Sequence, residues 1–358
     1  MKFALLLVFL LAAKMSVAAI SEIRTKIGPV MNPPITDGSN LYLLGTTGVL
    51  YQTDLPISKS KVLFQTKTSS VCPLTLKDSV LYFGEGLHDD TKTQFYAYDI
   101  KEQKIKFSLP QEGHIERAPL VTSKNIFLGL GPGGISAIEL KSQKVIWSKK
   151  KIEEGELHID STPISYQKMI CVSSIYGFKG IVCFNEKNGE KIFAIAFNKN
   201  PKSEIRLSGN LLYGMSSEAT MGDTNWATPS NLFVIDLELK KKTLDVNLRG
   251  YNFFAPAQTS SHEVFIGLST GDMILVNLQN GKITFVGEMK APIVSTAFIK
   301  HGMYCAISIE GKLRCYLREK NEFKLAKEEE WQEVVSGMVS AINGNFYIPT
   351  RTGYRLLQ

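Results

Sequence analysis

The chain is built from short runs of apolar residues, separated by polar, glycine-bearing turns along nearly its whole length. Asn40–Leu44 (NLYLL), Val80–Gly84 (VLYFG) and Glu263–Gly267 (EVFIG) are typical runs, and such runs are rich in Val, Ile, Tyr and Phe. Runs this short, with tight turns between them, predict β-strands. Their alternation with period 2 excludes helical repeats. We therefore expect an all-β protein.

The strands recur in one repeating unit of about 40–50 residues. Each unit starts near a proline and continues with a β-run, a glycine-containing turn, a second β-run, a polar turn with lysine, and a third β-run. The prolines that mark unit starts are Pro34, Pro73, Pro119, Pro163 and Pro256. A repeat of this length is typical of a β-propeller. It predicts one domain over residues 20–358, in place of the two or three domains that the length alone suggests.

We count eight units, which predict an eight-bladed β-propeller of four-stranded antiparallel blades. The last unit stops after its third strand, at Tyr354–Leu357. Glu22–Ile27 (EIRTKI) resembles the outer strand Lys144–Ser148 (KVIWS), so it can supply the fourth strand of the last blade. Such pairing closes the ring and removes exposed strand edges. The alternative is a seven-bladed ring in which one unit is misread.

Residues 1–19 have the three-part pattern of a cleavable secretory signal peptide. Lys2 precedes the apolar run Phe3–Ala13, and small residues lead to a cleavage position after Ala18 or Ala19. The run is shorter than the roughly 20 residues that span a bilayer. We expect a periplasmic or secreted protein with no membrane span. No cysteine stands at the cleavage position, so we expect no lipid anchor.

Composition and charge indicate a folded, mildly basic protein but no particular activity. The chain is 44% hydrophobic and 21% charged, as in a folded globular protein. Its formal net charge is +7, and loss of Lys2 and Lys14 with the signal peptide lowers this to +5. Export, and the absence of interleaved basic and aromatic residues, argue against a nucleic-acid partner.

Several units carry a shared sequence pattern. The matching segments are Phe95–Asp99 (FYAYD), Ile135–Glu139 (ISAIE), Leu232–Asp236 (LFVID), Asn280–Lys282 (NGK) and Val145–Trp147 (VIW). Together they resemble the quinoprotein-type (pyrroloquinoline-quinone-like) propeller repeat, with its Leu-Tyr-Ala-Leu-Asp strand, Thr-Gly-Lys turn and Trp-bearing strand. The resemblance covers nearly the whole mature chain, although each unit is degenerate.

Two branches of this superfamily imply different functions. One contains quinone-dependent alcohol and sugar dehydrogenases. The other is the periplasmic propeller subunit of the outer-membrane β-barrel assembly machinery, which binds other proteins. The length and the eight units resemble the second branch, although its lipidated cysteine is missing here. The resemblance implies a monomeric, non-catalytic scaffold that binds a protein of the cell envelope.

The motifs of catalysis are missing from the sequence. Quinone dehydrogenases of this family usually have a longer chain and calcium ligands, and many carry two adjacent cysteines. The five cysteines here are all separate, and no HExxH, GxSxG or P-loop is present. We therefore expect no enzyme activity, no cofactor and no metal. The alternatives are a quinone- or metal-dependent oxidoreductase and a propeller that binds a glycan or small ligand in its channel.

One polar motif occurs twice. His114-Ile-Glu116-Arg117 recurs one unit later as His158-Ile-Asp160. Both copies stand where the innermost strand of a unit begins, so a propeller sets them side by side at the mouth of its channel. Two imidazoles and two carboxylates could bind a metal or a cationic group. The alternative is that they are solvated loop residues retained from the repeat.

The two faces of the disc differ in character. Loops between the second and third strands of each blade share one face with the loops between blades. This face receives Glu85–Gln94, Met215–Ser230, Glu153–Asp160, Asn252–Phe254 and Lys327–Val335, the last of these expected as a helical turn. Long loops and exposed aromatic residues favour a protein interface here. The aromatic candidates are Trp226, Phe253, Phe254 and Trp331, unless the tryptophans only cover their own loops.

The opposite face collects the lysine-bearing turns. The lysines are Lys101, Lys104, Lys141, Lys144, Lys187, Lys191, Lys240, Lys241, Lys242, Lys282, Lys320 and Lys324. They form either a solvated rim that resists aggregation or a ring that contacts an anionic envelope surface.

Four of the cysteines occupy equivalent places in two units. Cys171 and Cys183 flank one glycine-containing turn, and Cys305 and Cys315 flank another. Cross-strand neighbours are about 4.5–5.5 Å apart at Cβ, close to disulfide range, and an exported protein can form disulfides. The alternative is that they are small buried residues between blades. Cys72 has no evident mate.

Overall fold

The computed structural model describes residues 22–23, 29–54, 60–220, 222–293, 295–320, 322–331, 335, 337–351 and 353–357. The expected signal peptide lies outside these ranges. Over the described residues the chain forms β-strands joined by turns and loops. None of the described residues belongs to a helix with the length and apolarity needed to cross a membrane.

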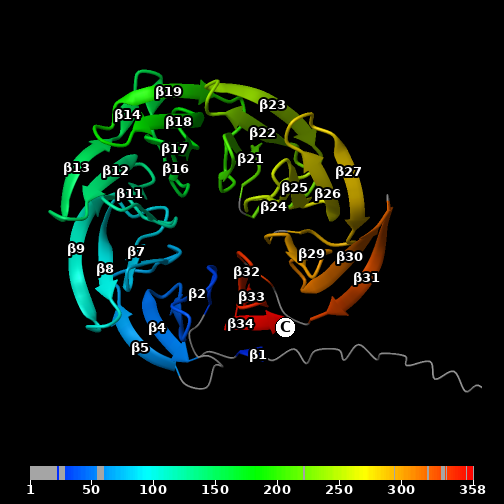
Figure 1. Ribbon diagram of the computed structural model, residues 1–358, viewed down its shortest axis with the longest axis horizontal. Helices are drawn as coiled ribbons and strands as arrows, with labels where there is room; N and C mark the ends of the chain where they lie inside the picture. Colours follow the sequence, from blue (N-terminus) through cyan, green and yellow to red (C-terminus); the bar gives the residue numbers. More distant parts are fainter. Residues whose placement is uncertain are drawn as a thin grey trace, which may run out of the picture.

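The strands form a ring of eight four-stranded antiparallel sheets, which are the blades of a β-propeller (Figure 1). The innermost strand of each blade is short, with two to four residues. Blades one and two are β2 (Ile35–Thr36), β3 (Asn40–Leu44), β4 (Val49–Asp54), β5 (Ser60–Gln65), β6 (Thr75–Lys77), β7 (Val80–Gly84), β8 (Lys92–Asp99) and β9 (Lys104–Glu112). Blades three and four are β10 (Leu120–Val121), β11 (Asn125–Gly129), β12 (Ile135–Glu139), β13 (Lys144–Lys149), β16 (Ile164–Tyr166), β17 (Met169–Ser174), β18 (Gly180–Asn185) and β19 (Lys191–Ala196).

The second half of the ring repeats this order. Blades five and six are β20 (Arg206–Ser208), β21 (Leu211–Ser217), β22 (Ser230–Asp236), β23 (Lys241–Leu248), β24 (Ala257–Ser260), β25 (Glu263–Gly267), β26 (Asp272–Asn277) and β27 (Ile283–Glu288). Blade seven is β28 (Phe298–Lys300), β29 (Met303–Ile307), β30 (Lys312–Glu319) and β31 (Glu322–Glu330). Blade eight contains β32 (Ser340–Ile342), β33 (Asn345–Thr350) and β34 (Gly353–Leu357).

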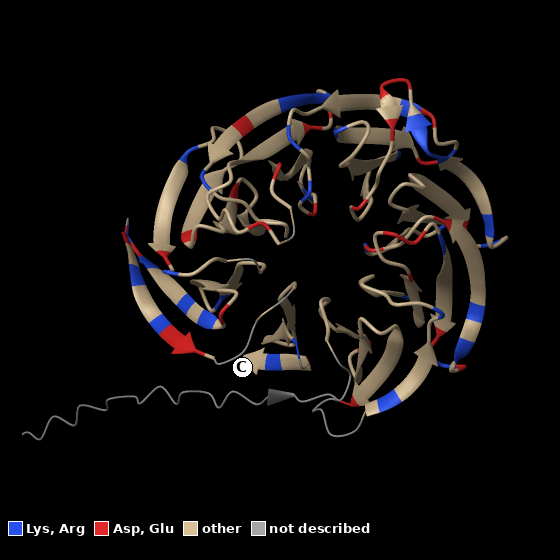
Figure 2. Cartoon of the chain, turned by 180° about the vertical axis from the view of Figure 1, so that it is seen from behind, with Lys and Arg blue, Asp and Glu red and all other residues tan. Residues whose placement is uncertain are grey.

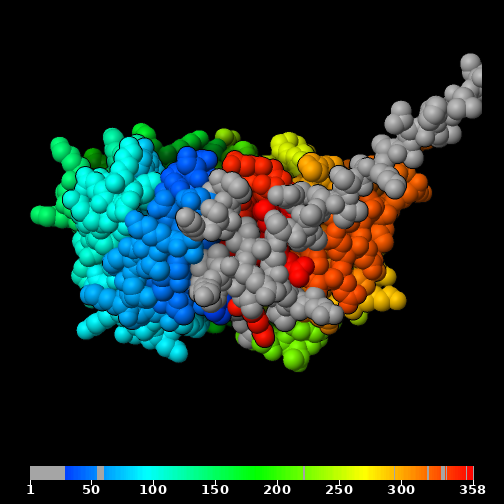
Figure 3. All heavy atoms as spheres, turned by 90° about the horizontal axis from the view of Figure 1, so that it is seen from below, coloured from blue at the N-terminus to red at the C-terminus, as the bar shows by residue number. Residues whose placement is uncertain are grey.

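The N-terminal strand completes the eighth blade. β1 (Glu22–Ile23) pairs antiparallel with β34, with Glu22 opposite Arg355 and Ile23 opposite Tyr354. Figure 3 shows the first blade, in blue, near the last, in red. The prediction of eight blades closed by an N-terminal strand is therefore confirmed, and the seven-bladed alternative is wrong. The strand is described over Glu22–Ile23, and residues 24–27 of the expected strand lie outside the described residues.

The core is a circle of apolar clusters, each packed between neighbouring blades. One such cluster joins Phe127 and Trp147 of blade three to Phe184 of blade four. The Trp147 indole also donates a hydrogen bond to the carbonyl of Glu186 in blade four (3.1 Å). A Cβ at Gly189 would lie 2.6 Å from this indole, so the ring packs directly on glycine backbone. The Trp and Gly positions of the repeat thus serve to dock one blade on the next.

The polar turns between third and fourth strands share one local structure. In blade five, the Asp236 carboxylate accepts the backbone N–H groups of Glu238 and Leu239, both at 2.9 Å. Asn277 does the same for two N–H groups in blade six. A side-chain oxygen at the strand end therefore fixes the turn. This explains why Asp or Asn recurs at that place in the repeat.

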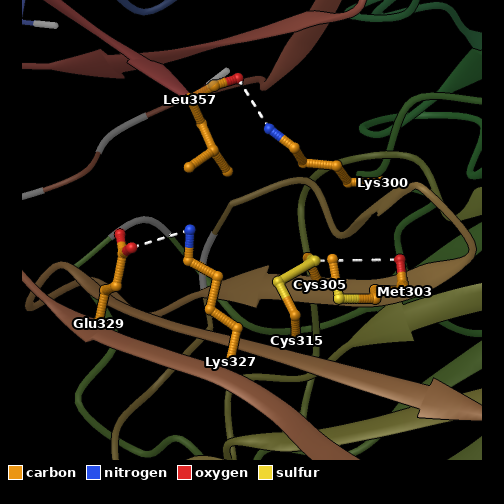
Figure 4. The surroundings of a disulfide bond; sticks show 7 residues. All are labelled: Lys300, Met303, Cys305, Cys315, Lys327, Glu329 and Leu357. Atoms are coloured by element: carbon orange, nitrogen blue, oxygen red, sulfur yellow. Dashed lines mark hydrogen bonds and ion pairs between the residues drawn. A yellow bond between two sulfur atoms is a disulfide. The ribbon is translucent and has the colours of Figure 1, made fainter. Parts of the chain in front are cut away.

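Both expected cysteine pairs are disulfide-bonded. Cys171 lies directly opposite Cys183 in blade four, and Cys305 lies opposite Cys315 in blade seven. The four residues are also buried in the clusters between blades. These cysteines are therefore both disulfide-bonded and buried between blades, so the two interpretations are both correct. Figure 4 shows the second bond beside Lys300, whose ammonium group donates to the Leu357 carbonyl (3.1 Å) and so ties blade seven to the last strand.

The expectation of a helical turn at Lys327–Val335 is wrong for residues 327–330. Residues through Glu330 extend the outer strand β31, which pairs with β30 as far as Lys312 opposite Glu330. Glu328 lies between Lys312 (3.1 Å) and Arg314 (2.8 Å) across this ladder. Cross-strand charge pairing thus stabilises an acidic run as a strand.

Candidate functional site

The long loops meet at one end of the channel, as the strand order requires. Four segments converge there: residues 85–91 between β7 and β8, 113–119 between β9 and β10, 157–163 before β16, and 175–179 between β17 and β18. Side chains from these segments contact one another across the boundaries of blades two, three and four. We call this region the channel mouth. The prediction that both copies of the His motif lie side by side is confirmed.

Asp160 lies between two histidines at the channel mouth. Its Oδ1 is 3.0 Å from Nε2 of His114, and its Oδ2 is 3.0 Å from Nε2 of His158. The Asp160 side chain is 8% exposed. An ionised carboxylate only accepts hydrogen bonds, so each imidazole donates to it from Nε2. One carboxylate thereby fixes two rings from different inter-blade loops.

The charges in this cluster reinforce one another. Burial raises the pKa of Asp160, but hydrogen bonds from His114 and His158 outweigh burial and hold that pKa well below its usual range. Burial lowers the pKa of His114, but the contact with Asp160 outweighs it and leaves the pKa raised. The carboxylate is therefore ionised at neutral pH and favours positive charge on His114.

His114 sits in a cradle that only glycine can form. The imidazole is fully buried, and a Cβ at Gly131 would lie 2.2 Å from its Nε2 atom. Gly131 also has a φ of 52°, in the left-handed region. The sequence Gly129–Gly134 between two strands thus supplies the space that this ring needs.

His88 completes the cluster, although neither copy of the repeated His motif contains it. It comes from the 85–91 loop, and its ring centroid is 5.4 Å from that of His114 and 5.6 Å from that of His158. Its Nδ1 is 3.7 Å from Oε1 of Glu116 and 4.0 Å from Oδ2 of Asp160. The sequence does place His88 in a long loop that is expected on the same face as His114. It was overlooked because it belongs to an insertion, and no other unit repeats it.

Arg117 lies behind this cluster. Its Nε donates to the backbone carbonyl of Asp160 (3.1 Å) and forms an ion pair with Glu204 (3.2 Å). Glu204 is 3% exposed and comes from the loop that follows blade four. The guanidinium is thus neutralised by Glu204, and it braces the segment that carries Asp160.

A pocket of about 520 Å³ opens beside the histidines. Its lining comes from most of the ring, which places it on the channel axis. The lining residues are Met31, Val71, Leu87, His88, Glu116, Arg117, Asp160, Ile175, Tyr176, Lys202, Thr220 and Phe253. Leu87 and Tyr176 are 40% and 41% exposed at its edge, and the Tyr176 ring is edge-on to His158, 5.0 Å between centroids. The pocket therefore combines an apolar rim with a charged wall.

The four aromatic candidates have different surroundings. Phe253 is half-buried and lines the pocket. Phe254 and Trp226 are also half-buried, and the Trp226 indole stacks on Tyr251, 6.4 Å between centroids. Trp331 is 4% exposed and packs in the core between blades seven and eight. The expectation that Trp331 is an exposed anchor is therefore wrong, because the strand before it carries the indole inward.

Four of the twelve lysines assigned to the opposite face form ion pairs with described acidic residues. Lys104 contacts Glu102 (2.8 Å), Lys324 contacts Glu319 (2.5 Å), and Lys242 pairs with Asp245. Lys191 reaches Glu154 (2.7 Å) on the hairpin of β14 (Lys151–Ile152) and β15 (Gly155–Glu156). Figure 2 shows acidic residues interspersed with the basic ones on the outer strands and their turns. Mixed charge of this kind favours the solvated rim.

Comparison with known proteins identifies a matching family model and solved structures of the same fold. The family model described as outer membrane protein assembly factor BamB matches residues 21–237. The crystal structure of BamB from Moraxella catarrhalis superposes with a TM-score of 0.68 at 11% identity, over 93% of this chain and 96% of that one. The crystal structure of the computationally designed Ika8 protein gives a TM-score of 0.69 at 12% identity, over 92% and 96%. No curated protein matches the sequence.

Proposed function

Because the chain belongs to the family of the outer membrane protein assembly factor BamB, we propose that it is an exported, non-catalytic scaffold for outer-membrane or envelope protein assembly. The observation that carries the proposal is the family match over residues 21–237, joined to a BamB-like fold over 93% of the chain. The proposed location is the periplasm, where a cleaved signal peptide would deliver it. The propeller acts as a monomer whose partner is another protein of the envelope.

The partner binds at the channel mouth, on the apolar rim of the pocket. Leu87, Tyr176 and Phe253 stand there beside charged Glu116 and Lys202. Partly exposed aromatic residues surrounded by polar ones are the usual energetic centres of protein interfaces. The loops that form the rim are held by the ring of blades, so binding costs little conformational entropy.

Affinity capture from a cell envelope fraction tests this proposal. The wild-type protein is expected to retain a component of the outer-membrane assembly machinery, identified by mass spectrometry. The double variant Tyr176→Ala/Phe253→Ala removes two rim side chains and is expected to lose most of that retention, since interface hot spots cost at least about 2 kcal/mol each.

Phe285→Ala is the matched control. Phe285 is 58% exposed, but it lies on the outer strand β27, away from the channel mouth. Equal retention by this variant and the wild type is the expected result. Equal loss in both variants would contradict the assignment of the interface, and failure of the wild type to retain any assembly component would contradict the proposed function.

A further inference from the structure

We propose that the channel mouth binds one divalent first-row transition-metal ion, zinc by preference, through His88, His114, His158 and Asp160. Three of the five histidines of the chain gather at this one place. One candidate ligand atom from each of the four residues lies within 4.8 Å of all the others. The inference does not rest on the proposed function, because it concerns only the donor atoms of the cluster.

The separation of the donor atoms suits a small ion after minor adjustment. Tetrahedral zinc has ligands at roughly 2.0–2.2 Å, which places the ligand atoms about 3.3–3.6 Å from one another. Nε2 of His114 is 3.0 Å from Oδ1 of Asp160, while Nε2 of His158 and Nδ1 of His88 are 3.0 Å and 4.0 Å from its Oδ2. The His88 side chain is 56% exposed on its loop, so it can move inward by the short distance required.

The kinds of donor select the class of metal. Three imidazole nitrogens and one carboxylate oxygen suit zinc and its neighbours. Calcium and magnesium take oxygen ligands almost entirely and would not be expected here. A set of four protein ligands is typical of a closed structural site and not of a catalytic one.

The surroundings hold the ligands in place. The cradle of Gly131 fixes His114, and Arg117 braces the backbone at Asp160. Glu116 lies 3.7 Å from Nδ1 of His88 and adds negative charge beside the site. His88 comes from a loop within blade two, His114 from the segment between blades two and three, and His158 and Asp160 from the segment between blades three and four. A bound ion would therefore clamp the loop that carries His88 against the two inter-blade segments.

Zinc titration of chelator-stripped protein without a polyhistidine tag tests the inference. Calorimetry is expected to show one equivalent of zinc bound, and cobalt substituted at the same site is expected to give the absorption bands of tetrahedral Co²⁺. Loss of a residue that merely supports a ligand costs about 10–100-fold in affinity. The ligand variants His88→Ala and Asp160→Asn are therefore expected to lose more than about 100-fold.

The two remaining histidines provide the control. His262 and His301 are exposed and lie in the turns between inner strands β24 and β25, and β28 and β29, on the opposite face. His262→Ala/His301→Ala is expected to bind zinc as tightly as the wild type. His88→Ala alters an exposed loop residue, so its thermal unfolding without metal should match that of the wild type. Absence of stoichiometric zinc in the wild type, or undiminished binding in His88→Ala, would overturn the inference and leave a purely hydrogen-bonded cluster.

Discussion

Gly131 and His114 show how one residue without a side chain can decide where another points. The imidazole occupies the volume that a Cβ at position 131 would fill, and it reaches Asp160 from there. The sequence predicted the pairing of the two His motifs, because a repeat places equivalent residues in neighbouring blades. It did not predict the cradle, because the turn contains several glycines and the sequence pattern does not distinguish Gly131 from the others.

Gly131→Ala is expected to destabilise the protein and to disturb the His–Asp–His cluster. The added methyl group would lie 2.2 Å from the His114 ring, and overpacking of this kind typically costs about 1–3 kcal/mol. Urea unfolding monitored by tryptophan fluorescence measures the change.

Gly209→Ala is the control that separates the steric clash with His114 from the cost of a left-handed backbone at alanine. Gly209 has a similar left-handed φ of 61°, but no atom lies within 4 Å of the place that its Cβ would take. Both variants share the penalty of a left-handed alanine, so Gly131→Ala should lose more stability than Gly209→Ala. Equal losses would mean that the cradle does not constrain His114.

At the scale of the elements, the hairpins of blades four and seven carry the disulfides and Cys72 remains free. Its thiol is fully buried, and burial raises its pKa to about 12. A raised pKa keeps the thiol protonated at all pH values below about 12, so the reactive thiolate is scarce at pH 8.

Thiol counting tests this assignment. Without reductant, the native protein at pH 8 is expected to react negligibly with a thiol reagent, and the denatured mature protein is expected to show one reactive thiol. Denaturation after reduction should expose all five. Five thiols without reduction would rule out both disulfides, and rapid native labelling would contradict the burial of Cys72.

The elements also show where sequence patterns succeed and where they fail. Cys171 and Cys183 could be paired because they occupy matching slots across one turn. The Lys327–Val335 segment was misread because a run of glutamates and a tryptophan resembles a helical surface. Its strand structure depends on Lys312 and Arg314 of the neighbouring strand. Such cross-strand pairing is invisible until the register is known.

At the scale of the whole molecule, ring closure turns a degenerate repeat into one rigid body. Apolar clusters link each blade to the next, and the last is linked to the first by Val30, Leu41 and Tyr354 among others. The number of blades and the closing strand could be predicted from the repeat alone. His88 could not be, because an insertion has no counterpart in the other units.

The same closure gathers residues that are far apart in the sequence around one axis. The pocket at the channel mouth takes its lining from Met31 near one end of the described chain to Phe253 in the loop between blades five and six. A partner that binds there contacts several blades at once. The central claim is therefore that this face, and not the outer rim, is the protein-binding surface.

Photo-crosslinking in cells tests that claim most directly. A photoreactive amino acid replaces Phe253 at the channel mouth or Phe285 on the outer strand. We predict a crosslink to a component of the outer-membrane assembly machinery from position 253 and none from position 285. Crosslinks to that component from position 285 alone would contradict the claim.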